Sequence, residues 1–159
     1  MKILVCVIGR LKTGPEQLLA ERYRARAGEL APKLGLSGPN VIEIPESRAR
    51  DEATRRRQEG EALIAKSQGA LRVALDERGR SLDSVEFASL ITRQRAAGTK
   101  ALAFLIGGAD GLAREVLAGA GEIISFGAIT LPHQLVRIVL LEQIYRGLTI
   151  RLGHPYHRP

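Results

Sequence analysis

Closely spaced glycines follow an apolar run in the segment Phe104–Gly111, which reads FLIGGADG. Glycines in such a turn adopt positive φ and let a ligand approach the backbone. Ligands of open α/β sheets bind beyond the carboxyl ends of strands, where this turn would lie. Ala109 and Leu112 break the dinucleotide fingerprint, and the Gly-Lys-Ser/Thr of a P-loop is absent. Spacing alone favours a plain strand-to-helix turn as the alternative.

A second candidate turn is Phe126–His133, which reads FGAITLPH. Its small residues Gly127 and Ala128 stand among apolar side chains and Thr130. This composition suits a flat, uncharged ring better than a phosphate. The alternative is an ordinary helix start, with Thr130 or His133 near the cap.

The tail, from 153 to 159, reads GHPYHRP and carries no acid. Two imidazoles, a phenol and a guanidinium lie within five residues: His154, Tyr156, His157 and Arg158. These groups suit stacking on a base and binding a phosphate. A frayed end is the common alternative, and the lack of acidic or cysteine neighbours argues against a metal site.

Nucleophilic catalysis has little support in the sequence. Cys6, the single cysteine, falls inside an apolar run where a thiol is usually inert, and it excludes a disulfide framework or a multi-cysteine metal site. The adjacent carboxylates of Asp76 and Glu77 point different ways in a strand. The chemistry is therefore expected to depend on positioning two partners more than on a covalent intermediate.

Length and composition indicate one globular domain over residues 1–159, with 45% hydrophobic and 26% charged residues. No apolar run approaches the ~20 residues of a membrane span, and no signal-peptide pattern is present. We therefore expect a soluble, cytoplasmic protein. The net charge of +7 favours a polyanionic partner such as RNA or DNA.

Short apolar runs alternate with helical patterns along the chain. Strands are predicted at 3–8, 41–44, 71–75, 101–106 and 123–126, and helices at 15–30, 51–66, 83–95, 112–117 and 132–146, with a loop at 76–79. Such alternation predicts an α/β fold with a largely parallel sheet flanked by helices.

The last predicted helix is apolar over more than half its circumference. Its apolar residues are Leu135, Val136, Ile138, Val139, Leu140, Leu141, Ile144, Tyr145 and Leu148. A surface helix needs a stripe only about 100° wide, so this helix must be buried on more than one side. We expect both a sandwiched position and a subunit interface, and hence a homodimer.

Several stretches together resemble one family. They are Leu75-Asp76, the LIGGADG turn, AITLPHQLVR from 128, EQIYR from 142 and the HPYHR tail. They are similar to the bacterial RlmH (YbeA-like) family of 23S rRNA pseudouridine N3-methyltransferases, in the SPOUT superfamily. The match spans the chain and is most specific in its last third. Ala109-Asp110 replaces a frequent Pro-Glu.

The resemblance implies a deep C-terminal trefoil knot, a rare exception to the usual rules of chain connection. It implies S-adenosylmethionine as cofactor, bound in a bent form by the knot loops, and no metal. The cofactor contacts carried over are Leu75, Gly107, Gly108, Phe126, Gly127, Ala128, Ile129, Thr130 and Leu131.

The implied reaction is methylation of N3 of a pseudouridine in 23S rRNA of the assembled 70S ribosome. In this reading His154 or His157 accepts the proton or orients the ring, Tyr156 stacks, and Arg158 and Arg137 hold phosphate. The tail of one subunit would complete the pocket of the other.

Two alternatives remain open at the level of sequence. One is a related knotted methyltransferase that acts on another RNA, at a ribose 2′-O or a guanine N1. The other is a non-catalytic ribosome-binding factor that keeps the fold without using the cofactor.

Overall fold

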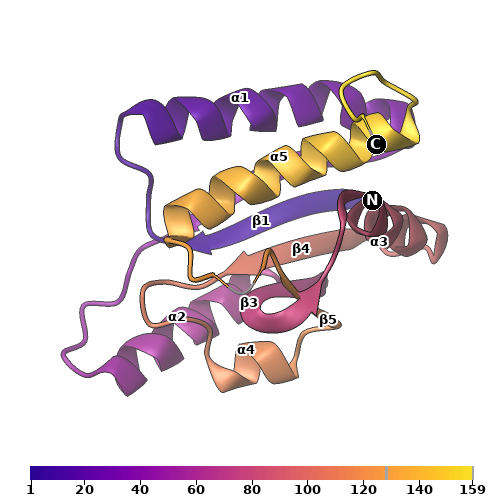
Figure 1. The fold of residues 1–159 in the computed structure, drawn as a ribbon. Helices are drawn as coiled ribbons and strands as arrows, with labels where there is room; N and C mark the ends of the chain where they lie inside the picture. Colours follow the sequence, from indigo (N-terminus) through magenta and orange to yellow (C-terminus); the bar gives the residue numbers. More distant parts are fainter. Residues whose placement is uncertain (128, 159) are drawn as a thin grey trace.

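The computed structural model describes residues 1–127 and 129–158 and shows a five-stranded, wholly parallel sheet in the order β2-β1-β4-β3-β5 (Figure 1). The strands are β1 Lys2–Ile8, β2 Ser37–Ile44, β3 Leu71–Ser81, β4 Ala101–Ile106 and β5 Glu122–Ser125. The helices are α1 Pro15–Leu30, α2 Glu52–Lys66, α3 Ser84–Ala96, α4 Arg114–Ala118 and α5 His133–Arg151, with a 3₁₀ turn η1 at Ala31–Leu34. The predicted α/β class with a parallel sheet is confirmed.

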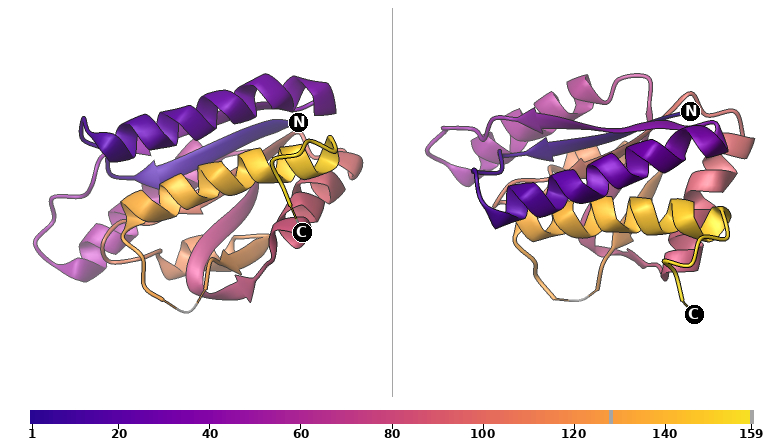
Figure 2. Two further views of the ribbon diagram at one scale, coloured as in Figure 1. Left: turned by 45° about the horizontal axis from the view of Figure 1, so that its top comes forward. Right: turned by 90° about the horizontal axis from the view of Figure 1, so that it is seen from above.

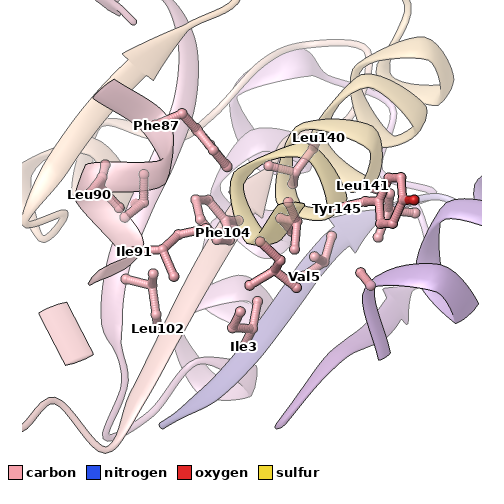
Figure 3. Packing of buried hydrophobic residues seen from close by; sticks show 14 of the residues in the cluster. Ile3, Val5, Phe87, Leu90, Ile91, Leu102, Phe104, Leu140, Leu141 and Tyr145 are labelled. Atoms are coloured by element: carbon pink, nitrogen blue, oxygen red, sulfur yellow. The ribbon is translucent and has the colours of Figure 1, made fainter. Parts of the chain in front are cut away.

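Helices cover both faces of the sheet. Helices α1, α3 and α5 pack on one face and α2 and α4 on the other, as Figures 1 and 2 show. Phe87 and Phe104 stack in the hydrophobic core between the sheet and helices α1, α3 and α5, with ring centroids 5.5 Å apart (Figure 3). Strands covered on both faces read as continuous apolar runs, which is why β1 and β4 were visible in the sequence.

Local signals fix several of the helix ends. Asp83 and Glu86 form a reciprocal capping box at the start of α3. The carboxylate of Asp51 accepts a hydrogen bond from the backbone N–H of Thr54 and caps α2. Pro15 occupies the first turn of α1, where its missing N–H costs nothing.

Strand β3 differs from its prediction. The predicted loop at 76–79 is wrong, because the chain stays extended to Ser81 and pairs with β5 on both sides of an irregularity between Leu75 and Arg80. At Gly79 a side chain would lie only 2.6 Å from the carbonyl carbon of Ile124, so glycine permits this close approach. The irregularity places Asp76 and its neighbours beside the candidate site described below.

Helix α5 ends at Arg151, beyond the predicted end at residue 146, because buried positions continue through Thr149. It lies beside α1 and α3 and over the sheet (Figure 2). Burial on more than one side is therefore confirmed within a single chain, while the homodimer stays a prediction.

Candidate active site

A cleft of about 850 Å³ opens at the carboxyl ends of β3, β4 and β5. Its lining includes Leu75, Gly107, Gly108, Phe126, Gly127, Ile129, Thr130 and Leu131. The structure thus brings together the residues carried over as cofactor contacts, apart from Ala128, which lies outside the described residues. The volume falls within the roughly 300–1,000 Å³ typical of small-molecule sites.

The glycine turn after β4 depends on the absence of side chains. A methyl group on Gly107 would lie 2.8 Å from the carbonyl carbon of Gly111, and Gly111 has φ of 80°. The N–H of Gly111 donates to the carbonyl of Gly108 at 3.0 Å and closes the turn. The backbone is therefore open to a ligand along one wall of the cleft.

The segment after β5 forms a second wall. Gly127 has φ of 121°, and its N–H and carbonyl both bond the hydroxyl of Ser125. The side chain of Ile129 is 71% exposed, unusual for a large apolar residue. The hydroxyl of Thr130 lies 3.4 Å from the carboxylate of Glu77 on β3. An apolar surface bordered by hydroxyl and carboxylate groups results.

An ionised carboxylate lies in the cleft at Asp76. Arg78 donates to both of its oxygens, at 2.8 and 3.0 Å. These bonds lower the pKa of Asp76 below its ordinary value. The cleft therefore keeps a negative group beside a nearby cation at neutral pH.

Two side chains of helix α2 contact the glycine turn. Arg55 donates to both oxygens of Asp110, at 2.7 and 3.2 Å, and lowers the pKa of that carboxyl. Glu59, only 6% exposed, accepts from the N–H of Ser47. A Cβ atom added to Gly108 would lie only 2.8 Å from Oε2 of Glu59. The Arg55–Asp110 pair thus joins the turn to α2.

Sequence reasoning treated His133 only as a possible helix cap, yet it lines the cleft. It is the first residue of α5, and its Nε2 lies 4.0 Å from Glu46. The sequence did offer one signal for this position: Pro132 starts the helix directly after the apolar turn, which puts His133 next to that turn. Asp76, Glu77, Arg78 and Arg56 also line the cleft without having been assigned to it.

The C-terminal tail lies at the far end of α5 from this cleft (Figure 1). The helix has 19 residues and spans roughly 28 Å at about 1.5 Å per residue. None of the tail residues His154, Tyr156, His157 and Arg158 lines the cleft.

Tyr156 packs against its own helix. Its ring meets that of Tyr145 with centroids 4.7 Å apart, and the guanidinium of Arg146 lies 4.8 Å from its centroid. Its hydroxyl donates to Glu142 at 3.0 Å. Burial, with hydrogen bonds to Tyr23 and Glu142, raises the pKa of the Tyr156 hydroxyl, so the phenol stays neutral.

The expected phosphate contact of Arg137 is wrong. Its side chain is 2% exposed and donates to Glu43 at 2.5 Å and to the carbonyl of Gly9 at 2.8 Å. An arginine buried in this way joins α5 to β1 and β2 and is closed to RNA.

Residues 1–127 and 129–158 contain no cluster of three or more His, Cys, Asp or Glu able to hold a metal ion. Within the same residues, no helix has the length and apolar character needed to cross a bilayer.

Known proteins match this chain over its full length. A family model described as predicted SPOUT methyltransferase matches residues 1–157. Ribosomal RNA large subunit methyltransferase H of Bradyrhizobium sp. (strain ORS 278) is 54% identical, covering 99% of this chain and 98% of that protein. The protein of the same name from Nitrobacter hamburgensis is 52% identical, with 99% of each covered.

Solved structures share the fold at low identity. A probable methyltransferase from Bordetella pertussis Tohama I gives a TM-score of 0.54 at 13% identity, over 92% of this chain and 95% of the other. A probable methylase family protein from Haemophilus influenzae gives 0.50 at 14% identity, over 99% and 70%. The two structures show only that the fold is shared. The family model and the relatives at 52–54% identity show in addition that this chain belongs to the SPOUT methyltransferase family.

Proposed function

We propose that this protein transfers the methyl group of S-adenosylmethionine to N3 of a pseudouridine in 23S rRNA, within the assembled ribosome and in the cytoplasm. The observation that carries the proposal is the meeting of the Gly107–Gly111 turn and the segment after β5 in one cleft. Full-length relatives at 52–54% identity carry the name ribosomal RNA large subunit methyltransferase H, which supports the rRNA substrate.

The cleft has the chemistry that a methyl-donor nucleoside needs. Leu75, Phe126 and Leu131 offer apolar walls to a flat base. The bare backbone at Gly107 allows close approach, since a side chain there would meet Gly111. Asp76 and Glu77 supply carboxylates that suit hydroxyl and ammonium groups. The trefoil knot that the family resemblance implies belongs to this same proposal.

The bound cofactor would supply a methyl group on a positively charged sulfur. That methyl carbon would bond to N3 while the electron pair of its old bond stays on sulfur, and the imide proton of N3 would leave to a base. Cleft residues fix the two reactants in line, a proximity effect. His154 and His157 are the proposed proton acceptors or ring-orienting groups, Tyr156 the stacking residue and Arg158 the phosphate contact.

These tail groups require a second subunit. Because the tail packs against the middle and far end of α5 and none of its residues lines the cleft of its own chain, it can serve only a neighbouring copy unless it refolds. We therefore propose a homodimer in which each tail completes the other subunit's site.

Methyl transfer from labelled S-adenosylmethionine to 70S ribosomes, separated subunits and protein-free rRNA tests the proposal. We expect label in 23S rRNA of 70S ribosomes, recovered after digestion as methylated pseudouridine. Label in a ribose, in a guanine or in tRNA would instead establish the related methyltransferase. A chain that binds ribosomes but shows no heat of binding with millimolar S-adenosylmethionine would be a non-catalytic factor.

Separate His154→Ala and His157→Ala variants then test the proton acceptor in single-turnover reactions. The acceptor's variant should react about 10²-fold slower or more. Unchanged rates for both would remove the imidazoles from the chemistry. The matched control is Glu61→Ala on the exposed face of α2, which lines neither the cleft nor the tail and should keep the wild-type rate.

A further inference from the structure

Basic side chains cluster on the loops that follow β1 and β2. They are Arg10, Lys12, Arg48 and Arg50, all exposed, and are called the basic strip below. All strands are parallel, so these loops lie at the same edge of the sheet as the cleft, namely the edge formed by the carboxyl ends of the strands. In the order β2-β1-β4-β3-β5, the strip follows the first two strands and the cleft the last three. Figure 1 shows β1 and β4 pointing toward this common edge.

The strip carries uncompensated positive charge. Among the ion pairs of the described residues, none involves a strip side chain. Four acids near the strip are engaged elsewhere: Glu43 by Arg137, Asp51 by the Thr54 N–H, Glu52 by Arg56 and Asp110 by Arg55. Glu16, in the first turn of α1, is exposed and has no ion pair among the described residues, so the four strip cations still outnumber the nearby acids that lack a cation. Glu46, 61% exposed, is 4.0 Å from His133. Cations without partners are free to meet an external anion.

Hydrogen bonds tie the strip to the cleft. The guanidinium of Arg55 donates to the carbonyls of Ala49 and Arg50 and also to Asp110 in the glycine turn. On the other loop, the N–H of Gly9 donates to the carbonyl of Ile44 at 2.8 Å. The strip backbone is therefore held at a set position relative to the cleft, which lowers the entropic cost of binding.

We infer that the basic strip binds the phosphates of the rRNA strand on one side of the nucleotide that enters the cleft. The inference rests on the proposed function for the identity of that nucleotide. Arginine and lysine at exposed positions bind phosphate and release condensed counterions, giving affinity without base specificity. The strip thus positions the strand, while the cleft and the tail act on the base.

The test compares the triple variant R10A/R48A/R50A with the matched control K2A/K33A/K100A. The control removes equal charge from exposed lysines at or before the amino ends of β1, β2 and β4, the opposite edge of the sheet. Binding to protein-free 23S rRNA and to 70S ribosomes is measured against salt, without cofactor. The strip variant should bind both at least about tenfold more weakly, and its slope of log affinity against log salt should fall by about 2 to 3.

The control should keep wild-type affinity and slope, and both variants should keep wild-type affinity for S-adenosylmethionine. Equal binding by strip variant and wild type, or an equal loss in the control, would overturn the inference. A loss on ribosomes alone would assign the strip to an acidic ribosomal protein and also overturn it. If wild type binds rRNA through the strip yet transfers no methyl group, the proposed function fails and the strip stands.

Discussion

Arg55 on α2 and Asp110 in the glycine turn are joined by two hydrogen bonds, at 2.7 and 3.2 Å, although they lie 55 positions apart in the chain. The same guanidinium reaches the carbonyls of Ala49 and Arg50. One side chain therefore connects the loop after β2, helix α2 and the turn after β4. This pair sets the position of the turn that lines the cleft.

Asp110→Ala should raise the KM for S-adenosylmethionine about tenfold or more, because the turn loses its attachment to α2 and must be ordered by the ligand. The methyl-transfer rate at saturating cofactor should change much less. Cofactor titrations followed by calorimetry and steady-state kinetics measure both quantities. Since Arg55 lowers the pKa of Asp110, the carboxylate stays charged and the attachment persists well below neutral pH.

The matched control is Glu61→Ala, which removes the partner of Arg57 on the exposed face of the same helix. It should leave cofactor binding unchanged, as surface pairs contribute little. A KM unaffected by Asp110→Ala would show that the turn is held by its own backbone.

Gly107→Ala should abolish measurable cofactor binding while the chain still folds. The new methyl group would lie 2.8 Å from the carbonyl carbon of Gly111, and backbone cannot yield as a side-chain end can. The turn must therefore deform. Calorimetry with S-adenosylmethionine and thermal unfolding separate loss of the site from loss of the fold. Gly28→Ala in α1, where the nearest atom is 3.8 Å away, should keep binding intact and stabilise the helix slightly.

Sequence reasoning found the turn at Gly107 and the apolar walls because glycine spacing and strand-end position are local signals. It missed the course of β3 beyond Leu75, since charged residues from Asp76 to Arg80 follow no alternation and pair with β5 only through a shifted register. It also assigned Arg137 to phosphate. An arginine in a predicted helix is expected to be exposed. The burial of Arg137 depends on its pairing with Glu43, which is distant in the sequence and gives no local signal.

Mixing two defective chains should restore activity if the tail of one subunit serves the cleft of the other. One chain carries Gly107→Ala, and the second ends at Gly153. Refolded together in equal amounts, they should reach roughly a quarter of wild-type activity, because half of the random dimers contain one complete site. Single-turnover methylation of 70S ribosomes measures the recovery.

Each defective chain alone should be inactive, and refolding either with itself is the control. Size-exclusion chromatography with light scattering must show dimers in all samples. A chain ending at Gly153 that keeps full activity would exclude the tail from the site, and a monomeric yet active wild type would exclude the dimer.

Cys6 should resist alkylation in the folded chain. It is fully buried in β1, and burial raises its pKa from 9.0 to about 11. The thiolate is thus scarce and covered at pH 8. Because the folded pKa exceeds the unfolded one, the thiol contributes stability below pH 9 that is lost as pH rises toward 11. Iodoacetamide labelling followed by mass spectrometry should show reaction only with denaturant; rapid labelling without it would contradict the burial.

Arg137→Ala should lower the free energy of unfolding by about 2–4 kcal/mol, because it leaves the carbonyl of Gly9 without its donor and Glu43 without its cation. The side chain of Glu43 is 34% exposed, so water partly compensates. Urea denaturation measures the loss. Arg22→Ala on the exposed side of α1 should change stability by less than about 0.5 kcal/mol. A phosphate-binding arginine would behave in the opposite way: the variant would keep its stability, and the salt dependence of rRNA binding would fall.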